Sequence, residues 1–379
     1  MIDFSQIPSP CYVADEDLLE SNLKVIREIS RRAGIDIIPA LKGFAMWGLF
    51  PRMQSYVNGM AASSPDEARL AYEEMHVRAH TYSPAYTDSG FDEILRYSNR
   101  ITFNSLTQYH RFREKTARYH PAVSMGLRVN PELSQVGTDL YNPCAPGSRL
   151  GLTRHLLGDT LPDGVEGLHV HALCESPAED TLRLMQTVEE KFGHFFPNLR
   201  WINFGGGHLM TRKGYDTELL IAAMRTFRAK YPHLHVILEP GAAFVWETGI
   251  LRATVEDVVS CNGIRTAILD VSFTAHMPDC LEMPYKPRIR GASDVQPGQQ
   301  AWRLGGNSCL AGDYMGDWSF REEPYAGMTV VFEDMLHYTM VKTTFFNGVP
   351  HPSIGTYSRQ KGFTLLKRFE YGDYKNRLS

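Results

Sequence analysis

The sequence predicts an α/β protein that consists of a (β/α)8 barrel and a C-terminal all-β domain. From residue 35 to about residue 240, short apolar runs alternate with segments that have helical periodicity. Eight such βα units are typical of a closed barrel of parallel strands. The apolar runs lie near residues 37–41, 59–62, 80–83, 101–103, 124–129, 167–172, 201–204 and 235–238. After about residue 245, long helical patterns disappear and strand-like runs follow one another.

These two patterns divide the chain into a barrel over residues 13–245 and a β domain over residues 246–379. In the β domain, Gly, Pro and Asn turns separate the strand-like runs, which favours a sandwich or a small barrel. The runs are 249–260, 265–273, 299–306, 327–335 and 338–346. We expect residues 1–12 to join this domain, because a strand within 9–14 precedes the first barrel unit and has no partner there.

Helix start signals support the alternation in the barrel. Ser64 and Ser176 are each followed by a proline and then, at the third position, by a glutamate, which is the pattern of an N-cap with a capping box. Asp216 precedes a third helical stripe of apolar residues and is its expected N-cap. The long segment 131–165 is poorly patterned and is the weakest part of the barrel prediction.

Composition excludes several classes of protein. The 379 residues are 43% hydrophobic and 22% charged, with a formal charge of −4, which argues against binding to nucleic acid or to an anionic membrane. No stretch approaches the ~20 apolar residues of a membrane span, and the N-terminus lacks the pattern of a signal peptide. Six dispersed cysteines form no CxxC pair, so we expect a cytoplasmic protein without a disulfide framework or a zinc knuckle.

One lysine stands at the end of the first apolar run. Lys42 follows "IIPAL" and precedes Gly43. Its side chain can extend from the strand end into water, as many lysines do. Alternatively, a desolvated lysine loses part of its preference for the charged form, and its neutral amine can form a covalent imine.

Other polar residues and glycines also stand at predicted strand ends, where barrels place their active sites. His169 and His171 end the sixth run and, being two apart, share one face of the strand. They can form a metal pair, or one of them can face a planar ligand. Gly205, Gly206 and Gly207 form either a simple turn or a phosphate cradle. Glu239 either caps its strand or places a carboxylate against a basic ring nitrogen.

Taken together, these residues fit pyridoxal phosphate better than they fit a metal. An imine-forming lysine, a phosphate cradle, an imidazole that stacks on a flat ring and a carboxylate for a pyridinium nitrogen are the groups that this cofactor needs. We therefore expect pyridoxal 5'-phosphate as the cofactor and no metal.

The motifs extend nearly from end to end and resemble those of one family. They include "PCYV", "ALKGF", "AASSPDEA", "LRVNP", "SRLGL", "HVHALCES", "FGGG", "EPG", "GNSCLAGD" and "HYTMVKTTFFNG". The chain resembles the fold-type III pyridoxal-phosphate decarboxylases, the family of ornithine and diaminopimelate decarboxylases. The resemblance implies an alanine-racemase-like barrel and a homodimer whose active sites are shared between subunits.

The resemblance also implies roles for matching residues. Lys42 resembles the Schiff-base lysine, and His171 the histidine stacked on the cofactor ring. Glu239 resembles the partner of the ring nitrogen. Cys309 resembles the cysteine that the neighbouring subunit contributes to protonate the carbanion. The other matching positions resemble residues that bind or adjoin the cofactor: Arg128, Gly205, Gly206, Gly207, Gly241 and Tyr338.

Within the family, the chain most resembles the carboxynorspermidine/carboxyspermidine decarboxylases of polyamine biosynthesis. Ala242 follows "EPG", where the ornithine and diaminopimelate enzymes usually have arginine, and "SCLAGD" points the same way. A long polycationic substrate needs spaced carboxylates. The candidates are Asp270, Asp279, Glu282, Asp313 and Asp317, with His276 as a further candidate site residue.

Three alternatives remain at this point. The substrate can be diaminopimelate or another basic amino acid. The chain can be a metal-dependent barrel hydrolase that uses His169 and His171. It can also be a pyridoxal-phosphate-binding homologue without catalysis, although the presence of both Lys42 and Cys309 argues against this.

Overall fold

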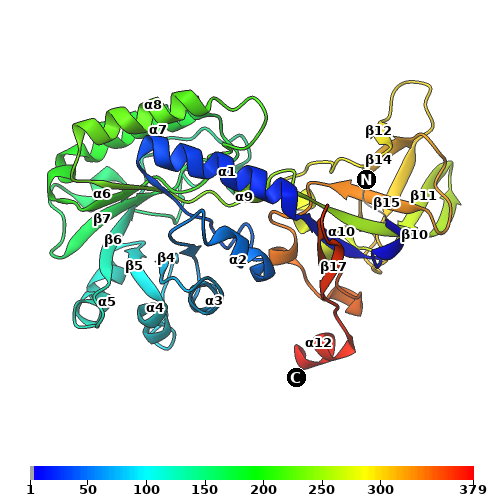
Figure 1. Ribbon diagram of the computed structural model, residues 1–379, viewed down its shortest axis with the longest axis horizontal. Helices are drawn as coiled ribbons and strands as arrows, with labels where there is room; N and C mark the ends of the chain where they lie inside the picture. The colour runs from blue at the N-terminus through cyan, green and yellow to red at the C-terminus, as the bar shows by residue number, and fades with distance from the viewer. Residues whose placement is uncertain (1–3) are drawn as a thin grey trace. The chain divides into compact units, whose positions relative to one another are not determined.

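The computed structural model describes residues 4–379 and divides into two compact units (Figure 1). The barrel unit comprises Asn22–Phe244. The β unit comprises the chain up to Ser21 together with Val245–Ser379.

The barrel unit contains an eight-stranded parallel sheet, which confirms the predicted (β/α)8 architecture. Its strands are β2 (Asp36–Ile37), β3 (Ala61–Ala62), β4 (Ala79–Tyr82), β5 (Ser98–Phe103), β6 (Ser124–Val129), β7 (Val165–Val170), β8 (Trp201–Asn203) and β9 (His235–Leu238). Neighbours in the chain are neighbours in the sheet, and β9 pairs with β2. The sheet closes between β2 and β3, because the Ala61 N–H donates to Pro39 O at 2.9 Å and the Leu41 N–H donates to Ala61 O at 3.0 Å.

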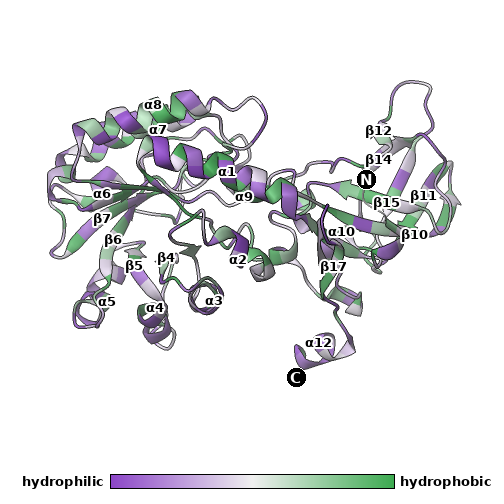
Figure 2. Ribbon diagram, viewed as in Figure 1, coloured by the Kyte–Doolittle hydropathy of each residue, from purple (hydrophilic) through white to green (hydrophobic). Residues whose placement is uncertain are grey.

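Helices connect the strands and carry one apolar face each. The helices are α1 (Glu16–Ala33), α2 (Phe50–Met53), α3 (Pro65–Met75), α4 (Phe91–Tyr97), α5 (Leu106–Ala117), α6 (Arg154–Leu157), α7 (Ala178–Phe192), α8 (Thr217–Lys230) and α9 (Ala242–Val245). Short 3-10 turns lie at Phe4–Gln6, Trp47–Leu49, Asp139–Tyr141 and Gly193–Asn198. Figure 2 shows hydrophobic and hydrophilic residues interleaved along α1, α7 and α8, as expected of helices that bury one side.

Two of the three predicted N-caps are confirmed. The Ser64 side chain accepts a hydrogen bond from the Glu67 N–H, and the Asp216 side chain accepts one from the Leu219 N–H. Ser176 was wrongly predicted, since α7 begins at Ala178 with Pro177 as its N-cap. The Ser176 N–H donates instead to Gly207 O at 2.7 Å, which holds the serine in a parallel bridge with His208.

One tryptophan fills part of the barrel interior. Trp201 is 3% exposed and packs in a cluster with Ile38, Ala40, Ala61 and Ile237. Gly126 and Gly167 are register partners on β6 and β7, and a Cβ on either would overlap the Trp201 indole. The absence of side chains at these two positions therefore makes room for the indole.

The β unit is a mixed sheet of nine strands. They are β1 (Cys11–Asp15), β10 (Gly249–Cys261), β11 (Ile264–Leu269), β12 (Ala292–Asp294), β13 (Trp302–Gly305), β14 (Tyr314–Phe320), β15 (Thr329–Glu333), β16 (Ser353–Ser358) and β17 (Gly362–Lys367). The strand predicted within 9–14 is present: β1 pairs with β10 and with β16. Three short helices belong to this unit: α10 (Phe273–His276), α11 (Pro278–Glu282) and α12 (Tyr371–Asn376).

The prediction of a strand over 338–346 was wrong. This segment contains a 3-10 turn at Met340–Lys342, and another turn follows at Phe346–Gly348. Tyr338 has a φ of 51°, which lies in the left-handed region and bends the chain away from a strand path. The Lys342 side chain, bonded to Asp279 and Glu282, holds the turn in place.

None of the helices within residues 4–379 has both the length and the apolar character needed to cross a bilayer.

The Trp201 packing leads to a stability prediction. We expect Gly167→Ala to lower the free energy of unfolding by about 1–3 kcal/mol, because the new methyl group overpacks the barrel interior. In a Trp201→Leu background the same substitution should cost much less. The matched control is Gly137→Ala, where an added Cβ has no neighbour within 4 Å, and its effect should stay within ~0.5 kcal/mol. Denaturant unfolding measures all four variants, and equal costs for Gly167→Ala in both backgrounds would contradict the packing argument.

Candidate active site

The carboxyl ends of the barrel strands bring the predicted barrel residues together. Lys42 follows β2 and the bridge at Ala40, His171 follows β7, and Glu239 follows β9. Arg128 lies on β6, and the run of Gly205, Gly206 and Gly207 begins two residues after the end of β8. The predicted cofactor-binding residues of the barrel therefore lie at one end of the sheet, as the barrel prediction required.

Lys42 and His171 face each other at this end. Lys42 Nζ lies 3.5 Å from His171 Nε2, and the Gly206 N–H donates to His171 Nδ1 at 2.8 Å. A backbone N–H can only donate, so Nδ1 carries no proton and the proton of the neutral ring sits on Nε2. The His171 pKa is well below its usual value because of burial and because of the nearby Lys42 charge. The neutral imidazole thus presents an N–H to the Lys42 amine.

The surroundings of Lys42 lower its pKa. Its side chain keeps contact with solvent, while protein groups surround its amino end. This partial loss of hydration lowers the Lys42 pKa, and the positive charge of Arg128 lowers it further. Arg128 is held in place: its Nη2 donates to His171 O at 3.1 Å, and its guanidinium lies 4.6 Å from the centre of the Tyr82 ring.

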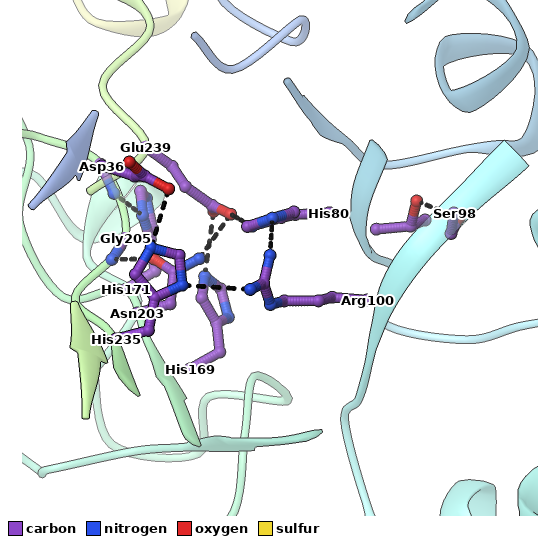
Figure 3. Close-up of polar contacts among 12 residues, drawn as sticks. Asp36, His80, Ser98, Arg100, His169, His171, Asn203, Gly205, His235 and Glu239 are labelled. Atoms are coloured by element: carbon purple, nitrogen blue, oxygen red, sulfur yellow. Dashed lines mark hydrogen bonds and ion pairs between the residues drawn. The ribbon is translucent and has the colours of Figure 1, made fainter. Parts of the chain in front are cut away.

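Glu239 is an acid in the barrel interior with several polar neighbours (Figure 3). Asn203 Nδ2 donates to Glu239 Oε1 at 2.5 Å, and His169 Nε2 lies 3.3 Å from Glu239 Oε2. Burial alone would raise the Glu239 pKa, but the contacts from His169, His80 and Asn203 outweigh burial and hold the pKa below its usual value. Glu239 is therefore a carboxylate at neutral pH.

The glycines after β8 are required by local packing. A Cβ on Gly205 would overlap Val170 O, and one on Gly206 would lie 2.6 Å from Glu239 O. Gly205 and Gly207 have φ values of 68° and 91°, which side chains rarely tolerate. Gly241 approaches Gly43 backbone to backbone. These contacts explain the glycines as a tight turn, and their role as a phosphate cradle stays a prediction.

Two predicted site residues of the β unit, Asp313 and Cys309, lie on the loop between β13 and β14, and a third, His276, ends α10. Asp313 is 4% exposed and accepts hydrogen bonds from the Thr274 N–H at 3.1 Å and the Ser308 N–H at 3.2 Å. Cys309 directly follows Ser308 in the chain and is exposed. His276 is buried, and burial lowers its pKa to about 3. Asp313 therefore stabilises the loop that carries Cys309.

The remaining β-unit candidates have different partners, and the structure does not bring them into one cluster. The Thr254 N–H donates to Asp270 at 2.8 Å, and burial raises the Asp270 pKa. Lys342 Nζ donates to Asp279 at 2.8 Å and also to Glu282. Asp317 pairs with Arg303 at 3.0 Å. Tyr338 is half-buried, and its ring centre lies 6.3 Å from that of His337.

Sequence reasoning missed a second group of polar residues in the barrel. Figure 3 shows Asp36, His235, Arg100 and His80 joined by polar contacts that lead to Glu239, with Asn203 on its other side. His80 and Arg100 are register partners on β4 and β5. β4 and β5 each contain several polar residues, so neither His80 nor Arg100 stood out in the sequence.

The metal interpretation finds no matching arrangement. The rings of His169 and His171 lie 6.5 Å apart between centres, and His169 faces Glu239. Within residues 4–379, no group of three or more His, Cys, Asp or Glu side chains is arranged to hold a metal ion.

Comparison with known proteins gives matches over almost the whole chain. Residues 11–335 match the model of a family described as pyridoxal-dependent decarboxylase, C-terminal sheet domain. A carboxyaminopropylagmatine decarboxylase from Synechocystis is 49% identical over 374 residues, which cover 99% of this chain and 96% of that protein. A carboxynorspermidine/carboxyspermidine decarboxylase from Campylobacter jejuni is 40% identical over 385 residues and covers 99% of each chain.

A solved structure agrees with these matches. The crystal structure of carboxynorspermidine decarboxylase from Campylobacter jejuni, complexed with norspermidine, superimposes with a TM-score of 0.89. It is 38% identical, and the match covers 98% of this chain and 100% of that one.

The Lys42 environment leads to a reactivity prediction. Because burial and Arg128 lower its pKa, Lys42 should be acylated at a lower pH than Lys230, whose pKa is raised by Glu189. Arg128→Met removes a nearby cation and should move the modification of Lys42 to higher pH. Mass spectrometry of cofactor-free protein after brief acylation at a series of pH values measures both lysines. Modification of Lys42 only at or above the pH at which Lys230 reacts would contradict the prediction.

Proposed function

The chain belongs to the family of pyridoxal-dependent decarboxylases, as its sequence motifs predicted, and on that premise we propose that it is a carboxy-lyase acting on a carboxylated polyamine. The proposed substrates are carboxynorspermidine and carboxyspermidine, with norspermidine and spermidine as products. The observation that carries the proposal is the grouping of Lys42, His171 and Glu239 at one end of the barrel, in a chain related over its full length to such decarboxylases.

A second substrate has its own support. The relative that is 49% identical is named for carboxyaminopropylagmatine, a compound that differs at its far end by a guanidinium in place of an amine. Both substrate types carry an amine beside the reacting carboxylate. Diaminopimelate and other basic amino acids share that part but are shorter, and they remain the alternative within the family.

The side chains of the barrel fit pyridoxal phosphate. Lys42 offers an amine whose pKa is lowered, His171 offers a flat imidazole next to it, and Glu239 offers a carboxylate already ionised in the interior. Arg128 adds a positive charge near these groups. In this proposal Lys42 would hold the cofactor covalently and Glu239 would serve its ring nitrogen. His171 would lie against the ring, and the backbone of Gly205, Gly206, Gly207 and Gly241 and the side chain of Tyr338 would hold the phosphate.

When bound, pyridoxal phosphate supplies a protonated ring that accepts the electron pair left by the departing carboxylate. Glu239 keeps the proton on that ring nitrogen, because an ionised carboxylate favours a protonated neighbour. His171 keeps its Nε2 proton directed at Lys42, which disfavours a positive charge on the lysine amine. Cys309 is the proposed proton donor to the substrate carbon after carbon dioxide leaves.

The proposal also covers assembly, location and substrate contacts. A homodimer, in which the partner subunit contributes Cys309, would complete each site with residues of the β unit. The cytoplasm is the proposed compartment, in keeping with six cysteines that are all free in the structure. The substrate amines are assigned to the β unit: Asp270, His276, Asp279, Glu282 and Asp313.

The first test of this function is carbon dioxide release by the purified protein, with and without pyridoxal phosphate. The panel comprises carboxynorspermidine, carboxyspermidine, carboxyaminopropylagmatine, meso-diaminopimelate and ornithine. We expect cofactor-dependent release from the carboxylated polyamines, and we expect Lys42→Ala to abolish it because no other amine replaces Lys42. Lys230→Ala is the control and should keep full activity, since Lys230 lies on the exposed end of α8.

Several outcomes would change the assignment. Release from diaminopimelate or ornithine alone would reject the polyamine substrates. Release from carboxyaminopropylagmatine alone would replace the amine-terminated substrates by the guanidinium-terminated one. A fully active Lys42→Ala protein would reject the mechanism.

The shared active site leads to a mixing prediction. Lys42→Ala and Cys309→Ala should each be nearly inactive as homodimers, the second by roughly 100-fold because a proton donor is lost. When the two variants are unfolded and refolded together, half of the dimers pair one subunit of each kind and contain one intact site. Activity should then recover to about a quarter of the wild-type value. Recovery is measured against each variant refolded alone, and no recovery in mixtures that do form dimers would contradict shared sites.

A further inference from the structure

A continuous line of polar contacts crosses the barrel interior and ends at Glu239 (Figure 3). His235 Nε2 donates to Asp36 Oδ2 at 2.7 Å, and Arg100 Nη2 donates to His235 Nδ1 at 3.1 Å. Arg100 Nη1 donates to His80 Nε2 at 2.5 Å, and His80 Nδ1 lies 3.9 Å from Glu239 Oε1. Four strands contribute to this line: β2, β4, β5 and β9.

Arg100 sets the direction of every hydrogen bond in this line. A guanidinium has donors only, so each ring nitrogen that it contacts must accept. His235 Nδ1 and His80 Nε2 therefore carry no proton. The proton of His235 is on Nε2, directed at Asp36, and the proton of neutral His80 is on Nδ1, directed at Glu239.

His80 is neutral, and its second nitrogen is held for Glu239. The side chain is 9% exposed, and burial together with the Arg100 charge lowers the His80 pKa to about 3. Among residues 4–379, His80 Nδ1 has no hydrogen-bond partner, although it is shielded from solvent. A buried N–H without a partner is costly, and a small movement toward Glu239 Oε1 would satisfy it.

With neutral histidines, the line holds one guanidinium and two carboxylates, and its net charge is −1. Arg100 carries one positive charge between the carboxylates of Asp36 and Glu239, each separated from it by one imidazole. A cavity of about 520 Å³ at the amino ends of β5–β8 is lined by Arg100 and Trp201, so that water can reach the guanidinium. Partial hydration makes a charge at this depth tolerable.

We propose that Arg100 is a positioning residue for the reaction: through His80 it presents an N–H to Glu239 and so keeps this carboxylate ionised and aimed at the cofactor ring nitrogen. This inference rests on the proposed function, because it assigns Glu239 the ring-nitrogen contact. His80 is the second positioning residue, and Asp36 and His235 hold Arg100 from the other side. None of the four needs to touch the substrate.

The inference separates positioning from binding. Glu239 acts on the ring after the substrate is bound, so weakening its support should lower kcat while leaving KM nearly unchanged. It should also alter the absorption spectrum of bound pyridoxal phosphate, because that spectrum depends on protonation of the ring. A purely structural role for Arg100 would not reproduce the spectrum of a Glu239 variant.

The test compares Arg100→Met, Glu239→Gln and the double variant in the cofactor-loaded enzyme. We expect Arg100→Met to lower kcat roughly tenfold, the size typical of losing a partner that orients an active-site ligand. Its cofactor spectrum should shift toward that of Glu239→Gln, and the double variant should match Glu239→Gln alone. Arg200→Met is the matched control: Arg200 lines the same cavity, but its side chain is exposed and pairs with Glu166, and the substitution should change neither kcat nor the spectrum.

Each outcome decides the proposal. The proposal would be overturned if Arg100→Met left the spectrum and kcat unchanged. It would also be overturned if Arg100→Met lowered kcat as much in the Glu239→Gln background as in the wild-type enzyme. If Arg100→Met does not fold, His80→Leu is measured by the same criteria, since it leaves the Arg100–His235–Asp36 contacts intact. A wild-type chain that binds no pyridoxal phosphate would overturn the proposed function itself, which separates that failure from failure of this inference.

Discussion

An ionised carboxylate inside a barrel is the constraint on which the site depends. Burial of Glu239 opposes its charge, and an unpaired buried charge costs several kcal/mol. The neighbours that offset this cost come from separate strands: Asn203 from β8, His169 from β7 and His80 from β4. His169 and Asn203 are register partners, so a slip of one residue between β7 and β8 would separate them. The register of the sheet is therefore a condition for the charge of Glu239, and the closed barrel fixes that register.

The packing below this polar layer supports it. Gly126 and Gly167 leave the space that the Trp201 indole fills, and the Arg100 guanidinium lies 6.0 Å from the centre of that ring. The indole thus offers an apolar floor and an aromatic face to the same cation that donates to both imidazoles. The absence of side chains at Gly126 and Gly167 therefore affects Arg100 through Trp201 and, through Arg100, the electrostatic surroundings of Glu239. In this barrel, the packing of the core and the placement of the charged groups therefore depend on each other.

Local patterns predicted most of the fold. Each barrel strand was marked by its own apolar run, and Ser64 and Asp216 marked helix starts, because these signals depend only on neighbouring residues. The predictions of an N-cap at Ser176 and of a strand over 338–346 were wrong because contacts with residues distant in the sequence determine the local structure. Gly207 holds Ser176, and Asp279 and Glu282 hold Lys342. Lys42, His171 and Glu239 could be identified from the sequence because each is a polar residue at the end of a predicted apolar strand. His80 and Arg100 could not, because β4 and β5 each contain several polar residues and the sequence does not show which of them face each other.

The acids of the β unit differ in what a polycation can gain from them. Asp279 and Glu282 already share Lys342, so an amine that binds them must replace an internal cation, and the gain is only the difference between the two pairings. The carboxylate of Asp313 already accepts hydrogen bonds from two backbone N–H groups. Asp270 is different, because burial raises its pKa and a nearby amine would favour its charged form. If these acids bind the substrate amines as proposed, discrimination among polyamines would depend on which internal partners must be exchanged, and a chain with a formal charge of only −4 would contribute little general attraction.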